Sequence, residues 1–137
     1  MDRNEIIAKF NEFPYDRGDY WLVAGGAMVM HGIKPHTKDI DLGCTVEMAD
    51  RLESDGVPHK LTRRGKRWFE FGGGIEIFED WLCDTTVTID GFRVVSLQGL
   101  IEMKRELGRE KDLRDIELIE SFIGGAPASA GTPGEGR

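Results

Sequence analysis

Hydrophobic positions change their spacing several times along the chain, and each change marks a predicted element. Apolar residues at positions 6, 7, 10 and 13 recur at helical spacing, which predicts an amphipathic helix over the first dozen residues. Residues 20–24, YWLVA, form a short apolar run that is typical of a buried strand. Two glycines, Gly25 and Gly26, interrupt this run, and the following AMVMHG favours a short helix that ends at Gly32.

A second predicted strand, residues 38–42, alternates acidic and apolar side chains. Ile40 and Leu42 lie on one face of that strand and Asp39 and Asp41 on the other, because successive side chains of a strand alternate. Further along, TVTIDGFRVV contains two alternating runs joined by Asp-Gly, which predicts a hairpin with a type I′ turn. The remaining pattern predicts a helix at 46–55, one or two strands within 60–71, a strand at 75–78, and helices at 96–107 and 111–122.

The composition is that of an ordinary globular protein with one domain. With 137 residues, of which 39% are hydrophobic, the chain can build a single core. We expect this domain to span residues 1–123 and a disordered Gly/Pro/Ala-rich tail to span 124–137. The net charge of −7 argues against broad attraction to nucleic acid, although a local basic patch could still provide it.

The sequence also predicts a cytoplasmic location. No apolar run approaches the roughly 20 residues that span a bilayer, and the first residues lack the apolar core of a signal peptide. Cys44 and Cys83 make neither a disulfide framework nor a Cys-x-x-Cys zinc pair. We expect both to pack as small hydrophobic residues in a reducing compartment.

Acidic residues form the first candidate site. Asp39 and Asp41 project from the same face of one predicted strand, and carboxylate oxygens placed this way suit Mg²⁺. The alternative for this pair alone is a solvated strand face. In GIEIFED, Glu76 points away from the face of the flanking isoleucines, so it would complete a three-carboxylate cluster if its strand lay beside the first. Clustered carboxylates repel one another unless cations lie among them, which implies bound metal.

A pair of glycines and several cations form the second group of candidate residues, and these could bind phosphate. Gly25 and Gly26 lack Cβ atoms, so their backbone could approach a phosphate closely at the start of the following helix. The alternative is a tight turn between strand and helix. Lys104, Arg109 and Lys111 punctuate the last two helices, where a cation could hold a triphosphate, or where an exposed helix could simply carry charge pairs. A basic run, residues 60–67, could grip an acidic acceptor or RNA, or form a solvated hairpin.

These motifs, in this order, resemble the nucleotidyltransferases of the DNA polymerase beta superfamily. The segments HGIKPHTKDIDL and VVSLQGLIEMKRELGREKDLRDIELI are most similar to its minimal and abortive-infection-type members. The resemblance implies an α/β (α+β) nucleotidyltransferase fold, with a mixed, partly antiparallel sheet and helices mainly on one face. It covers residues 20–122, and it departs at Glu76, where aspartate is more usual, and at Pro35, where relatives often have arginine.

The resemblance also implies roles for individual residues. Asp39, Asp41 and Glu76 would be catalytic and bind two divalent ions, Mg²⁺ or alternatively Mn²⁺, and Glu76 would help to deprotonate the acceptor. The nucleotide triphosphate would contact Gly25, Gly26, Lys104 and Lys111. Asp112 and Asp115 fall in an element that resembles the family's closing KD..D motif, where they could equally brace the last helix.

The expected activity is transfer of a nucleoside monophosphate from a nucleoside triphosphate (NTP) to a hydroxyl acceptor, with release of pyrophosphate. The acceptor could be a protein, tRNA or a small molecule, and such an enzyme could belong to a toxin–antitoxin or phage-defence system. The alternative is a non-catalytic domain of the same fold that binds a nucleotide or a partner. No second domain is left to hold the acceptor, so we expect a homo-oligomer or a helical partner protein, with contact through the apolar residues of the last helix.

Overall fold

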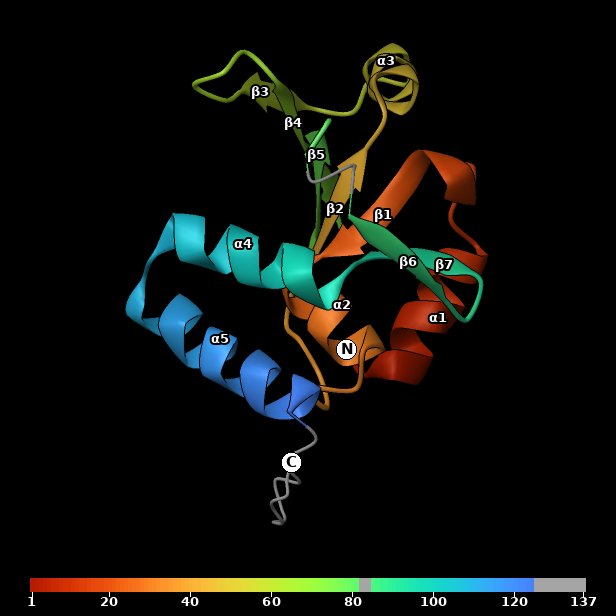
Figure 1. Ribbon diagram of the computed structural model, residues 1–137. Coiled ribbons are helices and arrows are strands. Elements are labelled where there is room, and N and C mark those ends of the chain that lie inside the picture. Colours follow the sequence, from red (N-terminus) through yellow and green to blue (C-terminus); the bar gives the residue numbers. More distant parts are fainter. Residues whose placement is uncertain (82–84, 125–137) are drawn as a thin grey trace. The chain divides into compact units, whose positions relative to one another are not determined.

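The computed structural model describes residues 1–81 and 85–124. Its residues divide into two compact units, one from Met1 to Ser96 and one that begins at Leu97. The first unit contains α1 (Arg3–Asn11), β1 (Tyr20–Val23), α2 (Ala24–Met30), β2 (Ile40–Cys44), α3 (Val46–Ser54), β3 (His59–Leu61), β4 (Arg67–Gly72), β5 (Ile75–Glu79), β6 (Thr86–Ile89) and β7 (Phe92–Val95), with a short 3₁₀ turn at Arg17–Asp19 (Figure 1). The second contains α4 (Leu97–Leu107) and α5 (Glu110–Ile123).

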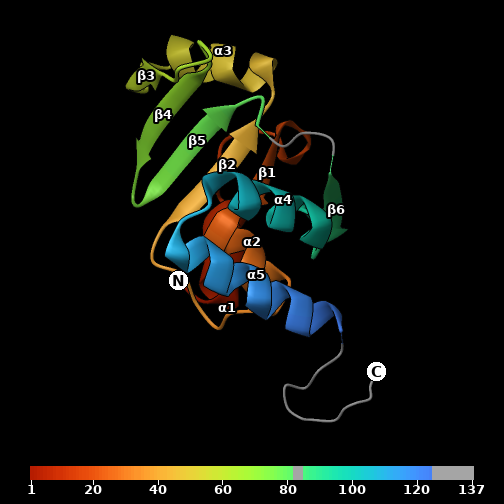
Figure 2. The same cartoon turned by 60° about the vertical axis from the view of Figure 1, so that its left-hand side comes forward.

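Seven strands of the described residues form one mixed sheet in the order β3-β4-β5-β2-β1-β7-β6. Figure 2 shows β4, β5 and β2 of this sheet side by side. β1 pairs antiparallel with β2, whereas β2 pairs parallel with β5 and β1 pairs parallel with β7. The pairs β3-β4, β4-β5 and β6-β7 are antiparallel. The expectation of a mixed, partly antiparallel sheet is therefore confirmed.

The helices of the first unit pack on one face of this sheet, which we call the helix face. Phe10 of α1 contacts Tyr20 of β1, and Gly26 of α2 lies against the side chains of Leu22 and Ile40. α3 reaches the same face through ion pairs of Asp50 and Glu53 with Arg67 of β4. The core residues of this face are Tyr20, Leu22, Ile40, Leu42, Phe69, Ile75 and Ile77, all at most 3% exposed.

Side chains that alternate with this core lie on the opposite face, which we call the carboxylate face. It carries Asp41 of β2, Glu76 of β5 and Glu70 of β4, and also the rings of Trp21, Trp68 and Phe78. The alternation on β5 is regular, because Ile75, Ile77 and Glu79 are buried while Glu76 and Phe78 are half-buried. The predicted separation of Glu76 from its neighbouring isoleucines is confirmed.

Two predicted boundaries are wrong in ways that bear on the site. Gly25 and Gly26 do not separate β1 from α2 but lie in the first turn of α2, which begins at Ala24. β2 begins at Ile40, so Asp39 precedes the strand instead of lying within it. The predicted hairpin is confirmed, because Asp90 and Gly91 both have positive φ, at 53° and 83°, as a type I′ turn requires.

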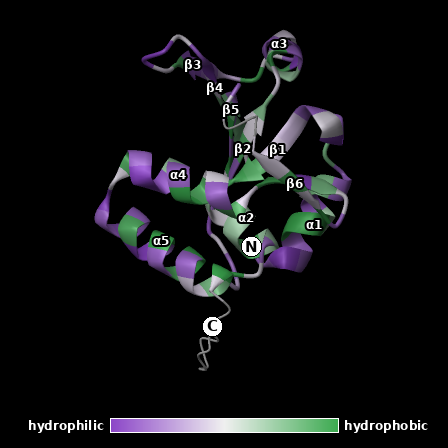
Figure 3. Ribbon diagram, in the orientation of Figure 1, coloured by the Kyte–Doolittle hydropathy of each residue, from purple (hydrophilic) through white to green (hydrophobic). Residues whose placement is uncertain are grey.

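The second unit is a pair of amphipathic helices, along which hydrophobic and hydrophilic segments alternate (Figure 3). Leu100 and Met103 of α4 and Ile116 and Ile119 of α5 are buried. Several apolar residues of α5 remain exposed: Leu113, Leu118, Phe122 and Ile123. None of the described helices is long and apolar enough to cross a membrane.

The predictions for the cysteines and the tail are tested only in part. Cys44 is fully buried in β2, and this burial raises the pKa of its thiol to about 12, as expected of a packed, unreactive cysteine. Cys83 and residues 125–137 of the predicted tail lie outside the described residues.

Candidate active site

Three carboxylates lie side by side on the carboxylate face. The parallel register of β2 and β5 pairs Asp41 with Glu76, and the antiparallel register of β4 and β5 pairs Glu76 with Glu70. Neighbouring strands are about 4.8 Å apart, so the three side chains form a continuous acidic row across β2, β5 and β4. Like charges placed directly opposite each other destabilise a sheet, which means that this row is not explained by the stability of the fold.

Asp39 joins the row from the segment just before β2. It is exposed, and its Oδ1 lies 3.6 Å from the position that a Cβ on Gly74 would occupy. The Ile40 amide donates to the Gly74 carbonyl over 2.8 Å, which holds this segment against the β4–β5 turn. All three glycines of that turn, at positions 72–74, have positive φ, so their lack of a Cβ is what lets the turn form here.

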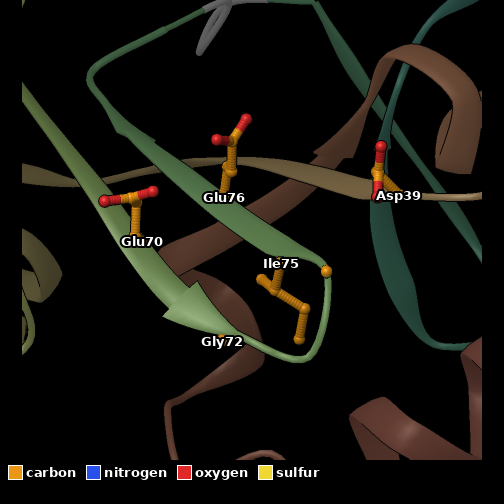
Figure 4. A pocket seen from close by; sticks show the side chains of 6 residues that line it. Asp39, Glu70, Gly72, Ile75 and Glu76 are labelled. Atoms are coloured by element: carbon orange, nitrogen blue, oxygen red, sulfur yellow. The ribbon is translucent and has the colours of Figure 1, made fainter.

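A pocket of about 250 Å³ lies at this end of the sheet (Figure 4). Figure 4 shows the carboxylates of Glu70 and Glu76 on the same side of β4 and β5, with the Asp39 carboxylate just before β2 pointing the same way. Its lining is Asp39, Glu70, Gly72, Gly74, Ile75 and Glu76. The pocket is therefore acidic, and it could attract a divalent cation but would repel a bare phosphate.

The donor chemistry of the site fits Mg²⁺ or Mn²⁺, which both prefer carboxylate oxygens. No ion pair to a described residue neutralises Asp39, Glu70 or Glu76. However, residues 1–81 and 85–124 contain no group of three His, Cys, Asp or Glu side chains that is arranged to hold a metal ion. The convergence of Asp39, Asp41 and Glu76 on metal therefore stays a prediction.

The glycine pair has a packing role that its sequence did not reveal. A Cβ on Gly25 would lie 2.3 Å from Thr37 Oγ1, and a Cβ on Gly26 would lie 3.1 Å from Leu22 Cδ2. Thr37 Oγ1 donates to the Asp39 carbonyl at 3.1 Å. The first turn of α2 is thus held close to the segment that carries Asp39, and phosphate contact by Gly25 and Gly26 stays a prediction.

Backbone strain marks the same turn. Ala24, the first residue of α2, has a φ of 52°, a left-handed conformation that costs a non-glycine residue about 1 kcal/mol or more. Such strain is concentrated at ligand-binding turns in other proteins. The strained backbone at Ala24 is therefore a second reason, besides the glycines, to regard the turn between β1 and α2 as a candidate binding element.

The cations predicted to hold the triphosphate belong to the second unit. Lys104 is buried, with its Nζ 2.9 Å from Asp115 Oδ2 and 3.8 Å from Asp112 Oδ1. Asp112 is completely buried, and the Arg109 guanidinium, which donates to it over 2.6 Å, holds the pKa of this carboxyl below its usual range. Asp112 and Asp115 thus brace α4 and α5, which is the alternative that the sequence left open for them. Lys111 is exposed, and nucleotide binding by Lys104 and Lys111 stays a prediction.

Comparison with known proteins gives the fold a name. No protein-family model and no curated protein matches the sequence. Among solved structures, a candidate nucleotidyltransferase from Thermotoga maritima superposes with a TM-score of 0.60 over 90% of this chain and 95% of its own, at 16% identity. ANT(2")-Ia in complex with adenylyl-2"-tobramycin superposes with a TM-score of 0.58 over 89% of this chain and 87% of its own, at 18% identity. The chain has the nucleotidyltransferase fold.

Within this nucleotidyltransferase fold, sequence reasoning missed two polar residues of the candidate site. Glu70 is the cross-strand partner of Glu76, and Thr37 links the Gly25 turn to Asp39. The signal for Glu70 is present in FEFGGGIEIF, because a glycine turn at 72–74 places the acid before it opposite the acid after it. Thr37 has no comparable signal, because its contact with Gly25 is made between two segments that are not paired strands.

Proposed function

We propose that this protein is a metal-dependent nucleotidyltransferase that moves a nucleoside monophosphate from an NTP to a hydroxyl group. The observation that carries the proposal is the acidic row, in which Asp41 and Glu76 are cross-strand neighbours and Asp39 and Glu76 share a pocket. A row of carboxylates with no described counter-ion for Asp39 or Glu76 is a costly feature, and a divalent cation would offset that cost. The nucleotidyltransferase fold of two solved structures supports the same chemistry.

In the proposed reaction the acceptor oxygen forms a bond to the α-phosphorus, and the bond from the α-phosphorus to the bridging oxygen breaks. The bond electrons leave with pyrophosphate, and the acceptor proton passes to a carboxylate, for which Glu76 is our candidate. When bound by Asp39, Asp41 and Glu76, two Mg²⁺ ions (or Mn²⁺) supply charge neutralisation around the transferred group. The chain itself positions the reacting groups, because Asp41 and Glu76 project from paired strands that hold them at a fixed separation.

The fold does not identify the acceptor of the nucleotidyl group. A protein, tRNA and a small molecule are all open, and the adenylyl-2"-tobramycin bound by ANT(2")-Ia is an example of the last. A place in a toxin–antitoxin or phage-defence system and a homo-oligomeric or helical partner are part of the same proposal. The exposed apolar residues of α5 are our candidate contact for that partner.

The test is incubation of the purified protein and of a lysate with NTPs labelled at the α-phosphate, with Mg²⁺ present. We expect label to enter an acceptor with wild type, to fall at least 100-fold with Asp41→Asn or Glu76→Gln, and to persist with Glu12→Gln, an exposed acid of the α1 C-terminus. Mg²⁺ should also raise the melting temperature of wild type more than that of Asp41→Asn, since a ligand of the native state stabilises it. Equal Mg²⁺ effects and no labelled acceptor would favour the non-catalytic alternative.

A further inference from the structure

A second row of side chains crosses the carboxylate face next to the acidic row. The strand registers pair Lys60 with Trp68, Trp68 with Phe78, and Phe78 with Gly43. Trp68 and Phe78 each lie two residues along their strands from Glu70 and Glu76, which is a separation of about 7 Å. We call Lys60, Trp68, Phe78 and Trp81 the aromatic row.

The rings of the aromatic row are already packed against one another. Trp68 and Phe78 are stacked, with ring centroids 5.7 Å apart and planes 14° apart, and Trp81 meets the edge of Phe78 at 4.9 Å. All three residues are half-buried, so each is partly exposed to solvent. Lys60 Nζ lies 6.0 Å from the Trp68 ring centroid, which is within reach of a cation–π contact.

A buried tryptophan fixes the position of Trp81. The Nε1 of Trp21 donates to the Trp81 carbonyl oxygen over 2.6 Å. This contact passes directly over Gly43, where an added Cβ would lie 2.1 Å from Trp21 Nε1 and 2.5 Å from the Trp81 oxygen. The absence of a side chain at Gly43 therefore allows the aromatic row to form beside the acidic row.

Unpaired cations continue the aromatic row onto the β3–β4 hairpin at the edge of the sheet (Figure 2). Of the basic run, Lys66 is paired with Asp80 at 3.2 Å and Arg67 with Glu79 at 2.6 Å. Lys60, Arg63 and Arg64 are exposed, and no described residue forms an ion pair with them. A solvated structural hairpin accounts for the two paired residues but not for Lys60 beside Trp68 and the two arginines of the turn that joins β3 to β4.

We propose that the aromatic row, together with Arg63 and Arg64, binds a single strand of nucleic acid as the acceptor of the nucleotidyl group. Aromatic rings that stack with bases and cations that contact the backbone are the two parts of a single-strand binding surface. The acidic row, about 7 Å further along the same strands, would then receive the terminal hydroxyl. This inference rests on the proposed function for its chemistry, but the binding surface can be tested without any catalysis.

Because the net charge is −7, affinity for nucleic acid would depend on where the cations lie. A protein of this charge has no general attraction for a polyanion, so nucleic-acid binding would depend on the few unpaired cations of one hairpin. Removal of Arg63 and Arg64 should therefore abolish most of the salt-dependent affinity. Removal of two other exposed arginines should change this affinity little.

The test is fluorescence anisotropy with a labelled 12-nucleotide RNA, and with single-stranded DNA and a poly-glutamate peptide as comparison probes, at 50 and 200 mM salt. We expect Arg63→Gln/Arg64→Gln to weaken RNA binding at least tenfold and to flatten its dependence on salt. Trp68→Leu should weaken binding about tenfold through lost stacking. The matched control is Arg105→Gln/Arg114→Gln, which removes the same charge from exposed positions of α4 and α5.

The outcomes separate this inference from the proposed function. Equal RNA affinity of wild type and Arg63→Gln/Arg64→Gln, with both folded by circular dichroism, would overturn it, as would tighter binding of the peptide than of RNA. Label transferred only to a protein or a small molecule would leave the proposed function standing and refute the inference. RNA bound through Arg63 and Arg64, with no label transferred to any acceptor in the presence of Mg²⁺ and NTPs, would refute the proposed function and leave only the binding surface standing.

Discussion

Arg67 is the side chain whose loss should most sharply alter the strands that carry Glu70 and Glu76. Its guanidinium lies 2.6 Å from Glu79, 2.9 Å from Asp50 and 2.9 Å from Glu53. Asp50 and Glu53 are more than half exposed, so each pair contributes at most about 1 kcal/mol. Glu79 is different, because its side chain is only 9% exposed and Arg67 lowers the pKa of its carboxyl.

The change Arg67→Met would leave Glu79 buried without a cation, and its pKa would then rise through burial. The penalty has a ceiling, because the carboxyl can bind a proton instead. With an unfolded pKa of about 4.3, protonation costs about 3.7 kcal/mol at pH 7 and about 1 kcal/mol at pH 5. We therefore expect Arg67→Met to lower the free energy of unfolding by about 3–4 kcal/mol at pH 7 and by about 1–2 kcal/mol at pH 5.

The sign of the pH dependence follows from the two pKa shifts. In wild type, the lowered pKa of Glu79 contributes stability that is present above about pH 4.3 and is lost as the pH falls through the folded-state pKa. In Arg67→Met the raised pKa means that the folded state binds the proton more tightly, so stability increases as the pH falls from 7 to 5. Urea denaturation at the two pH values measures both effects.

Two controls test this account of Arg67. Arg51→Met removes an arginine that is 52% exposed and pairs with Asp19 at 2.8 Å, and it should cost less than 1 kcal/mol at either pH. Arg67→Met/Glu79→Leu removes the stranded acid and should recover most of the loss. An equal loss at pH 7 and pH 5 for Arg67→Met, or no recovery in the double variant, would refute the reasoning.

Two further variants test the glycine turn and the second unit. Gly25→Ala places a Cβ 2.3 Å from Thr37 Oγ1 and should lower the free energy of unfolding, measured by urea denaturation, by about 1–3 kcal/mol. The double variant Gly25→Ala/Thr37→Ala should recover part of this loss. An unchanged free energy of unfolding in Gly25→Ala would show that the turn is not tightly packed. Lys104→Met removes the buried ammonium group that lies 2.9 Å from Asp115 and 3.8 Å from Asp112 and should lower the free energy of unfolding by about 2–4 kcal/mol. Lys111→Met, at an exposed position, should change it by less than about 0.5 kcal/mol. NTP affinity of both lysine variants, measured by calorimetry below their melting temperatures, should fall if the triphosphate contacts predicted from sequence are made, and unchanged affinity would remove both lysines from the site.

Local pattern was sufficient to predict most elements of this fold. The alternation in residues 75–78 placed Glu76 opposite its neighbouring isoleucines, and Asp90-Gly91 identified the hairpin turn, because both signals depend on residues that are adjacent in sequence. The boundary of α2 was wrong because glycine weakens a helix on average. In this protein, close packing of Gly25 against Thr37 requires glycine within the first turn.

Contacts between distant segments could not be predicted in the same way. The hydrogen bond from Trp21 to Trp81 spans 60 residues and depends on the bare backbone of Gly43 between them. In the sequence, Arg67 is one of several cations in a basic run. In the fold it forms ion pairs with Glu53 of α3 and with Glu79. Charge in a sequence shows how many ions exist, whereas only the fold shows which of them are paired.

Two glutamates of β5 show why pairing separates structural acids from candidate functional ones. Glu79 lies on the helix face, where Arg67 provides both a 2.6 Å ion pair and a 2.8 Å hydrogen bond from its backbone amide. Glu76, three residues earlier, lies on the carboxylate face between Asp41 and Glu70, and no described residue pairs with it. An acid that serves the fold acquires its counter-ion from the fold. An acid placed between two others without one is suited to a cation from outside the chain, which is why Glu76 is the residue on which the proposed chemistry depends.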